Sequence, residues 1–172
     1  KDILPGSNND SLRAPTFFSS LGDGKALFLA EDNVNGREVW VTDGTTVGTF
    51  LLKDIMPGSS TDSLTAPTFL GSLGASKALF VAVDNVNGRE VWVTDGTSVG
   101  TFLLKDIYPG SSTDSLKTPS FLVSLSNGKS LFSAVDNTNG REAWVTDGTS
   151  AGTLLLKDIY SGSQDSTPQL LA

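Results

Sequence analysis

The sequence predicts an all-β protein made of β-propeller blades, with one four-stranded antiparallel unit present in three copies. The segment 25–55 returns at 77–107 and again at 129–159, so the offset is 52 residues each time. The copies are rich in Val, Phe, Trp and Thr, which favour strands, and the breaks between apolar runs carry Gly, Asn and Asp. Because one copy is too small to bury its own apolar face, the copies are expected to stack.

In the first copy, four short apolar runs predict four strands. Runs of this length suit strands and are too short for helices. A polar loop at 56–66 follows the last run. In chain order, the predicted strands are 15–21, 25–31, 37–42 and 49–55.

Each break between these strands has a turn signal. The first is a tight Gly-containing break, and the second holds Asn35-Gly36, a pair that tolerates the positive φ of a hairpin. The third holds Asp43 and Gly44, where the carboxylate can accept hydrogen bonds from backbone N–H groups. Three hairpins in succession give an antiparallel meander. The predicted blades are 15–55, 67–107 and 119–159.

Alternation along the second strand indicates how the units pack. Leu27 and Leu29 point to one face, while Ala26, Phe28 and Ala30 point to the other. Both faces are apolar, so each sheet should be covered on both sides, as a propeller blade is. A β-trefoil, or another fold with pseudo-threefold repetition, is the alternative.

The two ends of the chain predict an incomplete array. Lys1-Asp2-Ile3 matches the end of a fourth strand, and residues 160–172 read as the start of a further blade or as an exchanged strand. Propellers typically have about four to eight blades, so three cannot close a ring. Closure is expected from a second copy, giving six blades, or from a longer protein, with Leu170 and Leu171 pairing with a partner's blade.

Composition excludes several classes of function. The formal net charge is −7 and the twelve basic residues are scattered, which argues against binding to nucleic acid or to an anionic membrane. No run of about 18 apolar residues suggests a membrane span. The chain has no Cys and no His, so thiolate or imidazole zinc sites and Ser-His-Asp triads are excluded. No catalytic set emerges, and neither an enzyme nor a cofactor is expected.

The third and fourth strands of each copy carry REVWVTDGTTVGTFLLKDI or a close variant of it. In these residues the chain resembles the bacterial ELWxxDGT repeat family, although Val39, Val91 and Ala143 replace its Leu. Ser161 also stands where the earlier copies have Pro57 and Pro109. The resemblance implies propeller blades in secreted or surface-attached bacterial proteins, and no common activity.

Two sets of repeated residues are candidates for binding, with one member of each set per blade. The tryptophans could stack on sugars, which would make the chain a multivalent lectin, or they could fill the space between sheets. The Thr-Asp-Gly-Thr aspartates could bind a ligand or hold their turn. The residues are Trp40, Trp92, Trp144, Asp43, Asp95 and Asp147.

A third repeated loop has weak calcium-loop spacing around Asp32, Asp84 and Asp136. A hairpin turn explains the pattern better, because Val83 and Val135 replace Glu31 in the later copies. The preferred hypothesis is an extracellular or cell-surface scaffold or adhesion module whose partner is a second copy of itself. A lectin and a calcium-stabilised surface repeat are the alternatives.

Overall fold

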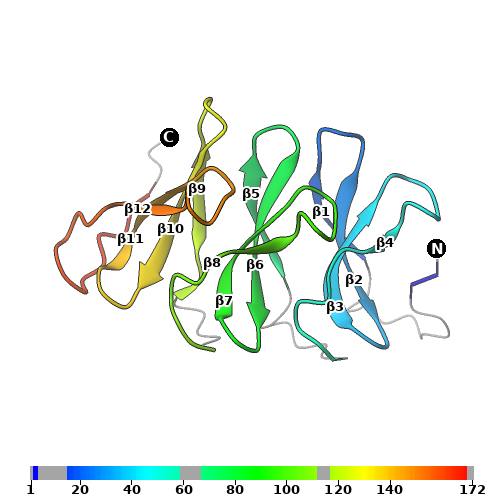
Figure 1. Ribbon diagram of the computed structural model, residues 1–172, viewed down its shortest axis with the longest axis horizontal. Coiled ribbons are helices and arrows are strands. Elements are labelled where there is room, and N and C mark those ends of the chain that lie inside the picture. Colours follow the sequence, from blue (N-terminus) through cyan, green and yellow to red (C-terminus); the bar gives the residue numbers. More distant parts are fainter. Residues whose placement is uncertain (1, 4–14, 59–66, 112–116, 170–172) are drawn as a thin grey trace.

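The computed structural model describes residues 2–3, 15–58, 67–111 and 117–169. Over these residues the protein consists of three four-stranded antiparallel sheets that lie in a row along the long axis (Figure 1). The three predicted meanders are confirmed. Residues 1, 4–14, 59–66 and 112–116 lie outside the described residues, as do the proposed exchange residues Leu170 and Leu171.

Each sheet follows the order of the chain, so neighbouring strands are joined by hairpins. The first sheet comprises β1 (Thr16–Ser20), β2 (Ala26–Asp32), β3 (Gly36–Thr42) and β4 (Phe50–Leu51). The second comprises β5 (Thr68–Leu73), β6 (Lys77–Asp84), β7 (Gly88–Thr94) and β8 (Phe102–Lys105). The third comprises β9 (Ser120–Ser124), β10 (Ser130–Asp136), β11 (Gly140–Thr146) and β12 (Leu154–Lys157).

The fourth strand of the first sheet is shorter than the predicted strand 49–55. Its ladder with β3 pairs only Phe50 and Leu51. Leu52 continues alongside, with its N–H donating to the Val39 carbonyl at 3.0 Å. Beyond the strand, Leu52 and Ile55 are 1% and 5% exposed. The ladder of this strand therefore ends at Leu51, while Leu52 keeps one backbone hydrogen bond to β3 and buries its side chain in the core.

Two apolar cores lie between the sheets, as the alternation predicts. Side chains from one face of each sheet meet side chains from the opposite face of the next. The first core combines Leu21, Leu27, Val39, Val41, Leu52 and Ile55 of the first sheet with Ala78, Phe80, Ala82 and Trp92 of the second. The second core combines Leu70, Leu73, Leu79, Val81, Val91, Val93, Leu104 and Ile107 of the second sheet with Phe132, Ala134 and Trp144 of the third.

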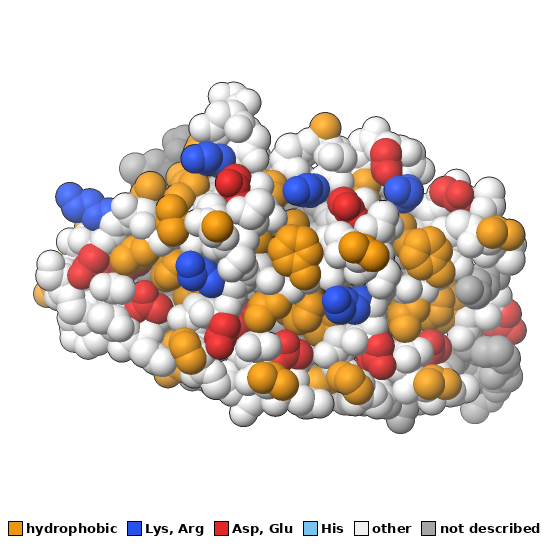
Figure 2. All heavy atoms as spheres, viewed as in Figure 1, with side chains coloured by type: hydrophobic (Ala, Val, Ile, Leu, Met, Phe, Trp, Pro, Cys, Tyr) orange, Lys and Arg blue, Asp and Glu red, His pale blue; other side chains and the backbone are white. Residues whose placement is uncertain are grey.

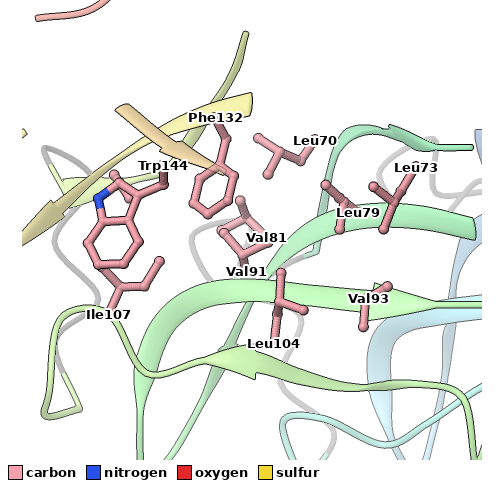
Figure 3. Close-up of a cluster of buried hydrophobic side chains, with 11 residues drawn as sticks. Leu70, Leu73, Leu79, Val81, Val91, Val93, Leu104, Ile107, Phe132 and Trp144 are labelled. Atoms are coloured by element: carbon pink, nitrogen blue, oxygen red, sulfur yellow. The ribbon is translucent and has the colours of Figure 1, made fainter. Parts of the chain in front are cut away.

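The second core shows how a large side chain fills the gap between two sheets. In Figure 3, Trp144 lies beside Ile107, and Phe132 points from the third sheet towards Val81 of the second. Phe132 is completely buried and Trp144 is 6% exposed. Only the second sheet has both of its apolar faces covered by neighbouring sheets, because it is the middle one of the three.

Polar contacts also join the sheets. Near the first strands, the Gly22 N–H donates to the Ala75 carbonyl at 2.7 Å, and the Ser124 hydroxyl donates to the Ser72 carbonyl at 2.7 Å. On the fourth strands, lysine ammonium groups donate to threonine carbonyls of the next sheet. The two bonds are Lys53 Nζ to Thr101 at 2.8 Å and Lys105 Nζ to Thr153 at 2.9 Å.

The C-terminal residues return to the third sheet. The Ser166 N–H donates to the Arg141 carbonyl at 3.0 Å, and the Arg141 N–H donates to Asp165 Oδ1 at 2.7 Å. The described part of the tail thus pairs with its own chain, at the start of β11. The described residues include no helix of the length and apolarity needed to cross a membrane.

Replacing Phe80 by Ala should lower the free energy of unfolding by about 3 to 5 kcal/mol, because it empties a fully buried site between two sheets. Phe28→Ala is the matched control. Phe28 has the same position in the first sheet but is only half-buried, so the loss should be clearly smaller. Urea unfolding of both variants tests this, and equal losses would contradict the packing described.

Candidate functional site

The Asp-Gly-Thr turns between the third and fourth strands are the most regular polar feature. Asp43 Oδ1 accepts the Thr45 N–H at 2.9 Å and the Thr45 hydroxyl at 2.7 Å. The Thr45 hydroxyl in turn accepts the Gly48 N–H at 2.9 Å, and the Thr49 hydroxyl donates to the Thr45 carbonyl at 2.6 Å. The same bonds recur around Asp95 and Asp147 in the other two sheets.

The turn holds the aspartate as an anion. Hydrogen bonds from the Thr45 side chain and backbone hold the pKa of Asp43 below its ordinary value, and Thr149 does the same for Asp147. A glycine closes the turn because there is no room for a side chain. A Cβ on Gly48 would lie 2.0 Å from Asp43 Oδ1. Asp43 and Asp147 are exposed and Asp95 is half-buried, and the hydrogen bonds of all three carboxylates stabilise their own turns.

The three repeated tryptophans lie inside the protein. Trp40, Trp92 and Trp144 are 5%, 6% and 6% exposed. Trp40 and Trp92 each pack on a phenylalanine of the neighbouring strand, with ring centroids 6.4 Å from Phe28 and 6.5 Å from Phe80. At this exposure none of the three rings offers an open face on which a sugar could stack.

The three weak calcium candidates each cap a hairpin. Asp32 Oδ1 accepts the N–H groups of Val34 and Asn35 at 2.9 and 2.5 Å, and Oδ2 accepts the Asn35 side-chain amide at 2.8 Å. Asp84 and Asp136 make the same bonds. Among the described residues, no three acidic side chains gather into a metal-binding group. Both oxygens of each carboxylate are thus engaged by the turn.

Three buried glutamates form a repeated feature whose role the sequence did not identify. Glu38, Glu90 and Glu142 are 1%, 1% and 0% exposed. Glu38 Oε1 accepts the N–H groups of Ile55 and Met56 at 3.2 and 2.8 Å. These carboxyls hold the chain that follows the fourth strand against the third strand. Recurrence of the Glu in every copy was the available signal, but it fits a surface ion pair with the preceding Arg equally well.

Burial changes the proton affinity of two of these glutamates. Desolvation raises the pKa of Glu38 from 4.5 to about 8 and that of Glu90 from 4.5 to about 7, although each accepts backbone hydrogen bonds. Glu38 Oε2 is buried and has no hydrogen-bond partner among the described residues. Glu38 is therefore mainly protonated at neutral pH.

Two cavities lie beside the third sheet, and their linings offer no reactive set. One, of about 410 Å³, is lined by Tyr108, Lys117, Asp136 and Asp165, with Lys117 Nζ 3.7 Å above the Tyr108 ring. Asp136 caps its hairpin and Asp165 accepts the Arg141 N–H, so both carboxylates are already engaged. The other, of about 430 Å³, is lined by the polar side chains Ser120, Ser133, Arg141, Thr167 and Gln169, with Phe121 and Pro168.

The surface seen in Figure 2 is mixed in character. Hydrophobic side chains appear at intervals across the row of sheets, with acidic and basic groups between them. Equivalent exposed residues on the fourth strands include Phe50 and Phe102, each 38% exposed. Charges of both signs are interspersed on this face.

No protein-family model matches the chain, and no curated protein matches it significantly.

Gly100→Ala should lower the melting temperature, because the new methyl group would lie 2.1 Å from Asp95 Oδ1 and displace the carboxylate from its turn. Asp95→Ala should lower it by a similar amount, since both changes remove the bonds to Thr97. Val99→Asp, in the same turn at a residue 94% exposed, is the control and should have little effect. Thermal unfolding followed by circular dichroism measures all three, and an unshifted Gly100→Ala would refute this account of the turn.

The free energy of unfolding should fall as the pH rises from 5 to 9. Below about pH 4.5 Glu38 is protonated in both states, and between about 4.5 and 8 only the folded state keeps the proton. The free energy of unfolding therefore falls there with rising pH, by up to about 1.4 kcal/mol per pH unit for each such carboxyl. Urea unfolding across this range gives the slope.

Two variants show which carboxyl groups cause the decline of the free energy of unfolding with pH. After Glu38→Gln, the decline that remains should end near pH 7, where Glu90 titrates. After Glu90→Gln it should continue to about pH 8, where Glu38 titrates. A slope unchanged by both substitutions would exclude the buried carboxyls as its source.

Proposed function

We propose that this protein is a non-enzymatic extracellular scaffold or adhesion module whose sheets are propeller blades, and that further blades complete its ring. The main observation behind the proposal is that a leucine buried in the second sheet is exposed at the equivalent position of the third. Leu104 of the second sheet is completely buried against the third, whereas Leu156, its equivalent in the third sheet, is 55% exposed. A blade that lacks its neighbour leaves this surface open.

The arrangement of strands supports the interpretation as blades. The first strands approach one another closely, as the Ser124 to Ser72 bond shows, and each meander runs from β1, β5 or β9 to the edge strand. Propeller blades run in the same way from an inner to an outer strand around a central axis. The resemblance to the ELWxxDGT repeat supports a secreted or surface-attached bacterial protein.

The roles of the repeated polar residues support a structural function. Asp43 and its copies hold a turn, and Glu38 and its copies hold the chain after the fourth strand. Trp40 and its copies are buried, and that observation does not favour a lectin. The Asp, Glu and Trp residues that recur in every copy therefore stabilise the sheet in which they lie. This structural role fits a scaffold or adhesion module, which acts through the surface of the assembled blades.

Negative-stain electron microscopy of the purified chain tests the architecture. We expect ring-shaped particles with a central axis, together with a mass by light scattering that is a multiple of the chain mass. Six blades from two chains is the expected ring. Rod-like particles that lengthen with concentration would contradict a closed ring, and a monomer at every concentration would contradict closure by self-association.

A further inference from the structure

The two internal interfaces are built by the same pair of surfaces. The leucine face of a sheet is the surface that meets the next sheet in the chain; in the first sheet it contains Leu21, Leu27, Val41, Leu52 and Ile55. The tryptophan face is the surface that receives it; in the second sheet it contains Ala78, Phe80, Ala82 and Trp92. The second and third sheets repeat this contact with the equivalent residues. A leucine face therefore has a defined partner, which is the tryptophan face of another copy of the same unit.

The leucine face of the third sheet is open. Leu156 and Ile159 are 55% and 61% exposed, whereas Leu104 and Ile107, at the same positions in the second sheet, are 0% and 5% exposed. Further residues of this face are also only half-buried, although their counterparts are at most 4% exposed. These are Leu125, Leu131 and Val145.

The tryptophan face of the first sheet is open in a matching way. Ala26, Phe28 and Thr42 are half-buried, whereas their counterparts in the second and third sheets are 0% exposed. These counterparts are Ala78, Phe80, Thr94, Ser130, Phe132 and Thr146. Ala30 and Trp40 remain buried, so the open part is the end nearest the Asp-Gly-Thr turn.

The surroundings of the glycine in that turn also differ between the first sheet and the other two. A Cβ on Gly96 would lie 2.8 Å from Leu21 Cδ1 of the preceding sheet, and one on Gly148 would lie 2.5 Å from Leu73 Cδ2. A Cβ on Gly44 would meet nothing within 4 Å. The turn of the first sheet is thus shaped to receive the leucine of a preceding hairpin, and Leu125 of the third sheet is the equivalent leucine.

A lysine makes one of the polar contacts across each internal interface. Lys53 and Lys105 are half-buried and donate to the carbonyls of Thr101 and Thr153 in the next sheet. Lys157, their equivalent in the third sheet, is exposed. The threonine equivalent to Thr101 and Thr153 in the first sheet is Thr49.

We propose that the leucine face of the third sheet binds the tryptophan face of the first sheet of a second copy, head to tail. Leu125 then covers Gly44 of the second copy, and Lys157 Nζ donates to its Thr49 carbonyl. The inference rests on the proposed function and defines the surface through which the blades assemble. The two faces lie at opposite ends of the row of sheets, so they cannot meet within one chain (Figure 1). Because the contact is heterologous, it generates a ring if the rotation closes.

A complementation experiment tests the pairing of the two faces. Leu156→Asp places a charge on the leucine face of the third sheet, and Ala26→Arg places one on the tryptophan face of the first. Each variant alone should have the mass of one chain by sedimentation velocity. An equimolar mixture retains one intact leucine face and one intact tryptophan face, so it should give a complex of two chains.

Controls separate folding from docking. Both residues are already partly exposed in a single chain, so circular dichroism and melting at low protein concentration should match the wild type. Val99→Asp changes a side chain that is 94% exposed and lies on neither open face, and it should leave the wild-type assembly intact. Lys157→Met removes the charged hydrogen bond and the contact with a tryptophan ring, equivalent to the one that Lys53 makes with Trp92, and it should weaken association roughly tenfold.

The outcomes that would overturn the proposal are distinct. If Leu156→Asp dissociates the assembly but Ala26→Arg does not, two leucine faces bind each other and the head-to-tail contact is wrong. If both variants keep the wild-type mass, assembly uses another surface, and self-association itself survives. If the wild type has the mass of one chain at every concentration, this interface and closure by self-association both fail.

Discussion

Packing of a leucine face against a tryptophan face is the contact on which the rest of this structure depends. Each four-stranded sheet has two apolar faces, and a sheet with both faces in water would not be stable. Phe80 and Phe132 are completely buried because a neighbouring sheet covers them, whereas Phe28 has no such cover and is only half-buried. The stability of one sheet thus depends on the sheets that cover its apolar faces.

The polar residues of the repeat are arranged around that contact. The Glu38 carboxyl fastens the chain after β4 to β3, which brings Ile55 into the core. The Asp43 turn places Thr49 beside Thr42, with their hydroxyl oxygens 2.7 Å apart. Lys53 then crosses to the next sheet. These residues recur in every copy because each sheet uses the same hydrogen bonds to hold its fourth strand and to contact the next sheet.

Local patterns were sufficient to predict the strands, the hairpins and their order. The Asn35-Gly36 pair and the Asp43 turn lie where predicted, because short-range hydrogen bonding and backbone sterics determine such turns. The early end of β4 was not predictable, since Leu52 and Leu104 have the same local sequence and similar burial, but only Leu104 lies within a strand. The burial of Glu38 was not predictable either, because it depends on a contact with residues far along the chain. From the sequence, an acidic residue beside Arg37 is expected at the surface, and only the structure shows its distant partner, the N–H of Met56.

The sequence by itself determined the period, the all-β class and the absence of Cys and His chemistry, because these follow from composition and from spacing along the chain. The tertiary structure decided which copies of an identical residue are buried. Leu52, Leu104 and Leu156 have the same side chain and nearly the same local sequence, but only the first two face another sheet. Burial depends on what lies across the interface, and that information is not present in any single repeat.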